Sequence, residues 1–411
     1  MKTTLPRQIQ FGREICNDLV QAERREWWLT NGVGAYAAGT IAGSLTRRYH
    51  GLLVTPVHPP LGRMLVFAKA DAEVTDGEQR WPLFTNRWGG GAVAPAGHHH
   101  IESFERDGRF PVWRYARGPH RVEMRVWLEP GANTTYVAYR LLPDQLSERP
   151  LTLKVKLLFN ARDHHGQTQA GDLHPSITGE PSLLRVGVNG LLTLYVGAMN
   201  GTIEPAYEWI NNFDLPVERE RGLPDRDNHL CVGYARLVLT PGKWTGIVAS
   251  LRPGASPDID KALARVRIHE CNVLARAKVA IAELADAPSW VDQLILAADS
   301  FVFARPLTDA PDGESVIAGY PWFGDWGRDT MIALPGLTLA TGRYDSARRI
   351  LETFARFVDR GMLPNVFPGA GEKPEYNTVD AALWFIEAWR AYVDVTGDEG
   401  ALRRAFPILA D

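Results

Sequence analysis

The sequence predicts a multidomain protein in which an antiparallel β domain precedes an all-α domain that forms an incomplete helical toroid. Three observations lead to this prediction. Short segments that alternate apolar and polar residues fill positions 1–255, and turn-forming residues separate them. Helical periodicity replaces this pattern further along the chain. Long polar and aromatic loops connect the later helices, which favours a helical ring whose loops gather at one end.

The N-terminal 255 residues are expected to form a β-sandwich or a barrel. The strand-like segments are short and rich in Val, Leu, Thr and Tyr, as in HGLLVTPV, RVEMRVWLEP, LTLKVKLLFNAR and CVGYARLVLTP. Gly, Pro, Asn and Asp interrupt them at close spacing. This pattern is typical of antiparallel strands rather than of βαβ units.

A single linker helix is predicted over residues 256–288. Ser256 or Asp258 would cap its start, and Pro288 would end it. Residues 289–411 are then expected to form the first part of the toroid. Its helices are predicted over residues 290–305, 328–342, 344–361, 378–398 and from 399 onward.

Periodicity also predicts which faces of these helices are buried. The helix over 344–361 carries one apolar stripe, formed by Ala347, Ile350, Leu351, Phe354 and Phe357. The helix over 378–398 carries another, formed by Val379, Ala382, Leu383, Ile386 and Val393. Left-handed glycines are expected to end helices at Gly342, Gly361 and Gly397.

Composition limits the partners and the compartment. The 411 residues carry a net charge of −3 with mixed signs, which indicates neither a nucleic acid nor an anionic membrane as a partner. Cys16, Cys231 and Cys271 are far apart and suit a reducing compartment. No signal-peptide core or membrane-spanning run is found in the sequence, so a cytoplasmic location is expected. Thirteen Trp residues are a weak indication of sugar binding.

The segment WFGDWGRDTMIALPG, residues 322–336, concentrates rings and charges directly before a predicted helix. Indole faces can cover the C–H face of a sugar, and the adjacent Arg328 and Asp329 can hold two neighbouring hydroxyls. A structural alternative stays open, in which Asp329 caps the helix and the rings are core. The side chains concerned are Trp322, Phe323, Asp325, Trp326, Arg328 and Asp329.

A second segment, PEYNTVDAALWF, places polar groups at the entrance of the next helix. Asn377 or Thr378 would cap that helix, and Asp380 would be favoured in its first turn by the helix dipole. The functional alternative is that Asn377 and Asp380 face the same funnel as Asp329.

Three other polar clusters are interpreted as structural. Residues 47–50 are expected to form a domain interface rather than a glycan contact, and residues 162–165 a salt-bridged turn. Three adjacent histidines in a strand would point to alternating faces and could not share a metal ion, so the histidines at 98–100 are expected to lie on the surface or in a loop.

The segment AGYPWFGDWGRDTMIALPG, followed by YNTVDAALWFIEAW, resembles the glucosidase domain of glycogen debranching enzymes. EWWLTNGVGAYAAGTIAGSLTRRYHGLLV resembles the N-terminal domain of their bacterial members. The resemblance covers about residues 26–411. A related Trp-x-Arg-Asp loop also occurs in glucoamylase-like glucosidases.

This resemblance implies a β-sandwich followed by an (α/α)6 toroid. It implies glycogen or another α-glucan as the partner, and hydrolysis of α-1,6-linked glucose with inversion by two carboxyl groups. No cofactor or metal is implied. The family pattern assigns substrate binding to Trp326, Arg328, Asp329, Asn377 and Asp380.

The family's general acid lies in a later TWMD-type motif, and its base lies later still. Neither motif is found here, so no catalytic residue is assigned and both groups are expected beyond residue 411. The chain is therefore expected to be truncated within the catalytic domain, and to aggregate or fold incompletely alone. The alternatives are a non-catalytic α-glucan-binding protein and a glucoamylase-like or trehalase-like glucosidase.

Overall fold

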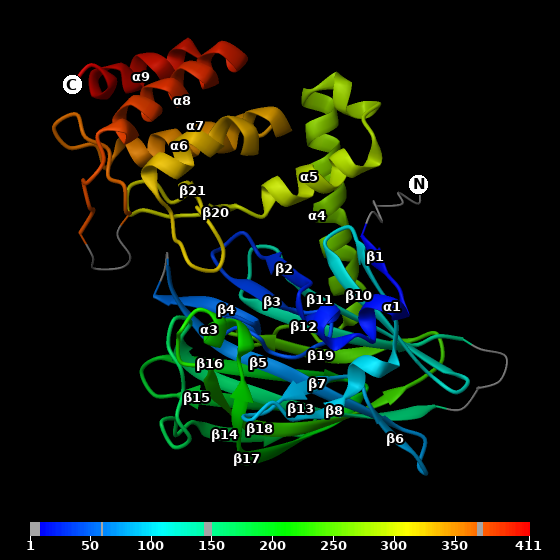
Figure 1. The fold of residues 1–411 in the computed structure, drawn as a ribbon. Helices are drawn as coiled ribbons and strands as arrows, with labels where there is room; N and C mark the ends of the chain where they lie inside the picture. Colours follow the sequence, from blue (N-terminus) through cyan, green and yellow to red (C-terminus); the bar gives the residue numbers. More distant parts are fainter. Residues whose placement is uncertain (1–8, 59–60, 144–149, 368–372) are drawn as a thin grey trace.

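The computed structural model describes residues 9–58, 61–143, 150–367 and 373–411. Two large antiparallel sheets form the N-terminal part, which we call the sandwich, and helices form most of the C-terminal part (Figure 1). The predicted order of a β domain before a helical domain is confirmed. Closure of the helices into an (α/α)6 toroid stays a prediction, as do the domain boundaries.

The first sheet contains nine strands within the described residues. All of its neighbouring strands pair antiparallel, and strands distant in sequence meet at its centre, where Val137 lies opposite Ile247. In spatial order the strands are β1 (Gln10–Phe11), β9 (Ile101–Asp107), β10 (Phe110–Arg117), β11 (His120–Leu128), β12 (Thr134–Leu141), β19 (Trp244–Ser250), β16 (Leu192–Met199), β15 (Leu183–Val188) and β14 (Ser176–Glu180).

The second sheet contains eight strands within the same part of the chain. Its order is β17 (Gly201–Asp214), β18 (Arg226–Leu239), β13 (Leu151–Asp163), β5 (Leu61–Thr75), β4 (Gly51–His58), β3 (Tyr36–Thr40) and β2 (Glu26–Thr30), with β6 (Arg80–Pro82) on β5. The smaller elements are α1 (Arg13–Cys16), α2 (Leu19–Glu23), the pair β7 (Thr85–Arg87) and β8 (Val93–Ala96), the 3-10 helix η1 (Gly97–His100), and α3 (Pro216–Glu220).

The apolar core of the sandwich lies between the two sheets. In β13 the side chains alternate, so that Leu153 and Val155 are buried while Lys154 between them is exposed. These inward side chains join Phe67 of the same sheet and Val137 of the other sheet in one cluster. Each buried aliphatic side chain contributes about 1.5–3 kcal/mol. The alternation recognised in the sequence therefore specifies a two-layer core.

Helix α4 (Ile259–Ala280) replaces the linker helix predicted over 256–288. The carboxylate of Asp258 caps its start by accepting a backbone N–H of the first turn, as predicted. The predicted end is wrong, because the backbone of Ile281 is extended and the helix stops there. Leu284 then packs against the apolar cluster formed by the end of α4 and the next helix. Tertiary packing thus overrides the helix propensity of this segment.

Helix α4 contributes to two apolar clusters, and Figure 1 shows it running from the sandwich into the helical part. Near its start, Val266 packs in a cluster with Trp127 of the first sheet. Near its end, Val273 packs in a cluster with Ile295 of α5 (Ser289–Asp299). The helix therefore joins the two parts through buried side chains rather than through a flexible linker.

The helix predicted over 290–305 is only partly correct. Helix α5 ends at Asp299, and the chain continues as β20 (Val302–Ala304), which pairs with β21 (Glu314–Val316). Val302 packs in the apolar cluster of the helical part. The strand forms because it lets this β-branched side chain reach the core, and the strand pair then positions the loop that follows it.

The remaining helices pack around one apolar cluster. The predicted stripe of α7 is confirmed, since Ala347, Ile350, Leu351 and Phe354 are fully buried, and Phe357 packs against the cluster beyond the helix end. The elements around this cluster are α6 (Gly327–Leu337), the 3-10 helix η3 (Leu339–Thr341), α7 (Tyr344–Ala355), α8 (Asp380–Thr396) and α9 (Glu399–Leu409). The 3-10 helix η2 (Ala282–Ala285) packs instead with the cluster of α4 and α5.

Two of the three predicted glycine helix ends are correct. Gly342 and Gly397 follow η3 and α8 with φ values of 69° and 67°, in the left-handed region. Gly361 also has a positive φ, but it lies in a turn and not at a helix end.

The stripe of α8 that the sequence assigned to the core is wrong. Val379, Leu383 and Ile386 are 76%, 64% and 48% exposed, whereas Phe385 and Trp389 are buried. Helix α8 carries apolar residues on more than one face, so its periodicity does not distinguish the buried face from the exposed one. The helical part therefore presents an exposed apolar surface on α8.

We expect the 411-residue chain to self-associate through this surface, because exposed contiguous apolar side chains favour association. Replacing Leu383 and Ile386 together by Ser should shift the chain toward monomer in size-exclusion chromatography with light scattering. The matched control replaces Val238 and Val279, which are 47% and 87% exposed on other elements. A monomeric wild-type chain with a sharp, reversible two-state melt would contradict this expectation.

Candidate functional site

A compact loop over residues 317–326, which we call the aromatic loop, precedes α6. The backbone N–H of Ala318 donates to the carbonyl of Gly324 at 2.8 Å and closes the loop. Near its tip, Trp322 and Phe323 are 39% and 45% exposed. Two large rings are thus held on the surface by a loop of fixed shape, where they can contact a ligand.

Asp325 anchors the aromatic loop from inside, and its predicted role in holding hydroxyls is wrong. Its side chain is buried; one carboxylate oxygen lies 3.1 Å from Nε of Arg305 and accepts a 2.9 Å hydrogen bond from Ser315. Burial raises the pKa of Asp325, while the charge of Arg305 and the Ser315 bond act in the opposite direction. The guanidinium of Arg305 also lies 5.3 Å from the ring centre of Phe367.

Backbone contacts bring the two sequence motifs together. Trp326 forms a bridge with Val366, and Val366 forms another with Glu375. The N–H of Gly327 donates to the carbonyl of Asn365 at 2.8 Å. The start of α6 and the segment that leads into α8 are therefore fixed side by side.

Arg328 and Asp380 face each other across the first turns of α6 and α8. A guanidinium nitrogen of Arg328 lies 3.8 Å from a carboxylate oxygen of Asp380, and the two side chains are 42% and 47% exposed. At this distance they form a loose ion pair rather than a tight hydrogen bond. Both groups therefore retain the capacity to bond to a ligand.

Asp329 and Asn377 are both exposed. The structural alternatives offered for them are wrong, since the N-cap positions of α6 and α8 are Trp326 and Val379, and neither cap uses a side-chain hydrogen bond. Thr378, the other predicted cap, does not fill that role either. Assignment of substrate binding to Trp326, Arg328, Asp329, Asn377 and Asp380 stays a prediction.

The aromatic loop and the sandwich together line a cavity of about 230 Å³, which we call the loop cleft. Trp326 is the one predicted binding residue among its lining side chains, and the ring centres of Trp326 and Phe323 are 5.4 Å apart. Sequence reasoning missed the contribution of the sandwich, because no local pattern indicates which strand ends meet a distant loop. The principal lining side chains are Arg63, Asp163, His165, Trp322, Phe323 and Trp326.

Trp322 lies against charged and aromatic side chains of the sandwich. Its ring centre is 6.3 Å from that of Tyr49, and the guanidinium carbons of Arg47 and Arg221 lie 5.7 Å and 5.3 Å from it. Contacts of a guanidinium with an indole face contribute about 0.5–2 kcal/mol. The interface predicted for residues 47–50 is confirmed at Arg47 and Tyr49.

The turn at residues 162–165 also contacts the aromatic loop. Arg162 forms the expected salt bridge, at 2.8 Å to Asp227. His164 is buried, with Nε2 3.3 Å from the carbonyl oxygen of Pro321. Burial lowers the pKa of His164 to about 4, and the charges of His165 and Arg63 act in the same direction. Neutral His164 therefore supports the docked loop.

Two other kinds of site find no support in the described residues. No group of three or more His, Cys, Asp or Glu side chains there could hold a metal ion. The histidines at 98–100, expected on the surface or in a loop, lie in η1, where His99 is exposed but His98 is buried beside Thr85. Among the described helices, none combines the length and apolar character that crossing a membrane requires.

Comparison with known families gives two matches along the chain. A family model described as "Glycogen debranching enzyme N terminal" matches residues 25–245, which is more than half of the chain. A model described as "Amylo-alpha-1,6-glucosidase" matches residues 296–411. Both segments that resemble this family lie inside the matched ranges.

The individual proteins and solved structures that resemble this chain either have low sequence identity to it or match a smaller part of it than the two family models do. A glycogen debranching enzyme of Saccharomyces cerevisiae is 34% identical over 132 residues, which is 29% of this chain and 8% of the yeast protein. A bacterial glucoamylase complexed with acarbose has a TM-score of 0.44 at 12% identity, over 90% of this chain and 57% of that chain. A putative kojibiose phosphorylase from the human microbiome has a TM-score of 0.43 at 9% identity, over 97% and 57%. The chain thus spans less than two thirds of each.

The anchoring role of Asp325 predicts a loss of stability on substitution. Asp325→Asn should lower the free energy of unfolding by on the order of 3 kcal/mol, because it removes the buried carboxylate that faces the Arg305 guanidinium. Urea unfolding measures this change. The exposed Asp329→Asn is the matched control and should stay within about 0.5 kcal/mol of wild type. Equal effects of the two substitutions would contradict the anchoring role.

The burial of His164 predicts acid-sensitive stability. Its folded pKa of about 4 lies below the ordinary 6.5, so the unfolded chain binds a proton between these values that the native state excludes. The contribution of neutral His164 to the free energy of unfolding is complete above pH 6.5 and is lost as the pH falls toward 4. Between pH 7 and pH 5 the free energy of unfolding should therefore fall by about 1–2 kcal/mol. Urea unfolding of His164→Gln should show a correspondingly weaker pH dependence than wild type. An unchanged pH dependence in the variant would refute this role, and His174→Gln, at an exposed histidine, is the control.

Proposed function

Because the chain belongs to the glycogen debranching enzyme family, we propose that its loop cleft binds glucose units of an α-glucan during hydrolysis of α-1,6 branch linkages. The observation that carries the proposal is the placement of Trp322, Phe323 and Trp326 around one cavity. Three aromatic side chains in a surface cleft are suited to a ligand with apolar C–H faces and no net charge.

Polar groups at the starts of α6 and α8, outside the cavity lining itself, match the hydroxyl groups of such a ligand. The loose pair of Arg328 and Asp380 offers donors and acceptors side by side, with an overall charge of zero. A neutral polyol can insert between these groups without leaving an uncompensated charge. From the sandwich, Arg63 and Asp163 provide a second donor and acceptor in the cleft lining.

We propose inversion at the anomeric carbon for the reaction as a whole. That mechanism needs one carboxylic acid to protonate the leaving oxygen and one carboxylate to activate water, at a separation of roughly 6.5–9.5 Å. Asp325 is unsuited to either role, since its carboxylate is buried in the contact with Arg305 and Ser315. Asp329 and Asp380 are proposed to bind substrate, and we assign no acid or base in this chain.

The proposed binding function is tested by calorimetric titration of the chain with a phosphorylase limit dextrin. Trp326→Ala should weaken binding roughly tenfold, as expected for loss of one stacking face worth about 0.5–1.5 kcal/mol beyond its buried area. Arg328→Ala should weaken it as well. The matched control is Trp290→Ala, which removes a 54% exposed ring on α5 outside the loop cleft.

The same titration separates the alternatives. Preference for the limit dextrin over maltose and trehalose supports a debranching role, whereas preference for maltose or trehalose indicates a glucoamylase-like or trehalase-like substrate. If the protein binds the glucan but no assay detects release of glucose, the non-catalytic alternative is favoured. Absence of binding, or an equal loss with Trp290→Ala, would refute the proposal for the loop cleft.

A further inference from the structure

A second cavity, which we call the junction cavity, lies where the sandwich, α4 and the first elements of the helical part meet. Its volume is about 390 Å³, within the roughly 300–1,000 Å³ of small-molecule sites. Among the described residues, its lining and that of the loop cleft have no member in common. Six lining side chains are important for its chemistry: Arg109, Trp127, His269, Asp299, Glu314 and Arg343.

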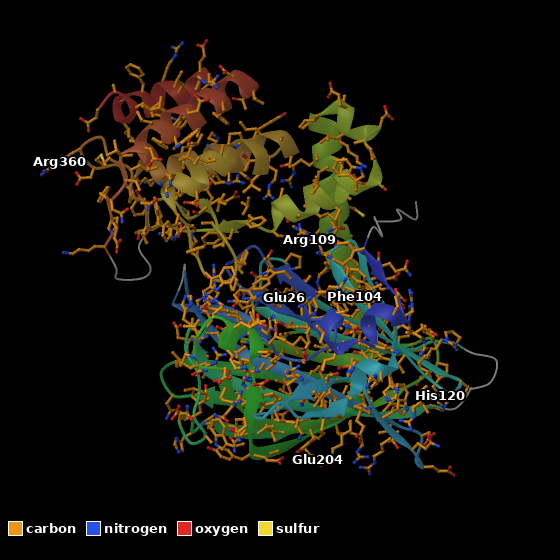
Figure 2. The ribbon with its side chains drawn as sticks, viewed as in Figure 1. Glu26, Phe104, Arg109, His120, Glu204 and Arg360 are labelled. Atoms are coloured by element: carbon orange, nitrogen blue, oxygen red, sulfur yellow. The ribbon has the colours of Figure 1, made fainter. Side chains whose placement is uncertain are left out.

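One buried carboxylate organises the polar wall of the junction cavity. Asp299 pairs with the guanidinium groups of Arg109 and Arg343, and Nε2 of His269 lies 3.3 Å from its carboxylate. Burial alone would raise the pKa of Asp299, but the two guanidinium charges and the His269 bond hold that pKa well below its ordinary value. Figure 2 shows Arg109 at this junction. The wall is therefore pre-organised by groups from all three parts.

Four lining residues also carry polar atoms that are buried behind the cavity surface and whose bonding capacity is unused. Nε of Arg109, Nε of Arg343 and Nε1 of Trp127 are buried donors, and one carboxylate oxygen of Glu314 is a buried acceptor, for which the described residues offer no hydrogen-bond partner. Leaving such a buried group without a hydrogen bond is unfavourable. Small side-chain rotations, which are common on ligand binding, would let a ligand in the cavity meet them.

The charges around the junction cavity favour an uncharged ligand. Its lining contains two arginines and two carboxylates. Each carboxylate is already paired: Asp299 with Arg109 and Arg343, and Glu314 with Arg349 at 2.6 Å. An anion would be repelled by the carboxylates and a cation by the guanidinium groups. Phe303 adds apolar ring surface to the lining, beside that of Trp127. A molecule with several hydroxyls and an apolar C–H face satisfies both kinds of surface.

We propose that the junction cavity is a binding site for a neutral polyhydroxylated molecule of monosaccharide size, separate from the loop cleft. The ligand would contact the sandwich, α4 and the helical part at once, so its binding stabilises their arrangement. Arg109, Arg343 and Trp127 donate to its oxygens, and Glu314 accepts from a hydroxyl.

Equilibrium dialysis with radiolabelled glucose tests this proposal. Ala304→Trp is the blocking variant, because Ala304 lines the cavity and its side chain is exposed at the end of β20. We expect this variant to bind one glucose fewer per chain than wild type. Ala340→Trp, at an exposed alanine outside both cavities, is the matched control and should bind as wild type does.

Because Ala304→Trp could lose glucose binding by misfolding, a second and smaller substitution tests the same site. Glu314→Gln keeps the side-chain volume and should weaken glucose binding at this site about tenfold. Because it also weakens the ion pair with Arg349, its thermal melt should move to a lower temperature but stay cooperative. Trp322→Ala removes a ring of the loop cleft and should leave the junction site unchanged, so failure of one site is distinguished from failure of the other. Unchanged glucose binding in both Ala304→Trp and Glu314→Gln would overturn the proposal, as would stronger binding of glucose 6-phosphate than of glucose.

Discussion

The buried contact between Arg305 and Asp325 is the constraint on which the candidate site depends. It lies between the β20–β21 pair and the start of α6, where the chain changes from strand to helix. Two charges removed from water tolerate little displacement, because separation would leave each without compensation. The carboxylate therefore fixes the base of the aromatic loop, and the closed turn above it leaves Trp322 and Phe323 at the surface.

Local features of the chain were predicted well because local physics determines them. Asp258 caps α4 since its side chain needs only the N–H groups of the next turn, and the stripe on α7 is buried since that helix has one apolar face. Predictions failed where distant contacts decide the outcome. The end of α4 depends on the packing of Leu284, and the buried face of α8 depends on which of its apolar residues meet neighbouring helices.

The same division applies to the candidate site. Trp326, Arg328 and Asp380 were singled out as candidates because aromatic and charged residues are concentrated in short segments before two helices. In the opposite wall of the loop cleft, Arg63 was missed because it lies in a strand with no distinctive local sequence, whereas Asp163 was noticed but interpreted as part of a structural turn. Asp325 was placed among the ligand-binding groups because its burial depends on Arg305 and Ser315, which precede it by many residues.

Helix α4 has a mechanical consequence for the loop cleft. Its two ends are embedded in different apolar clusters, so it acts as a strut between the sandwich and the helical part. A hinge motion that opens the cleft would have to disrupt the apolar packing of one of these clusters. The width of the loop cleft, between the indole rings and the strand ends, is therefore fixed in the folded chain. The thickness of a ligand then limits its entry before any hydrogen bond to its hydroxyl groups can form.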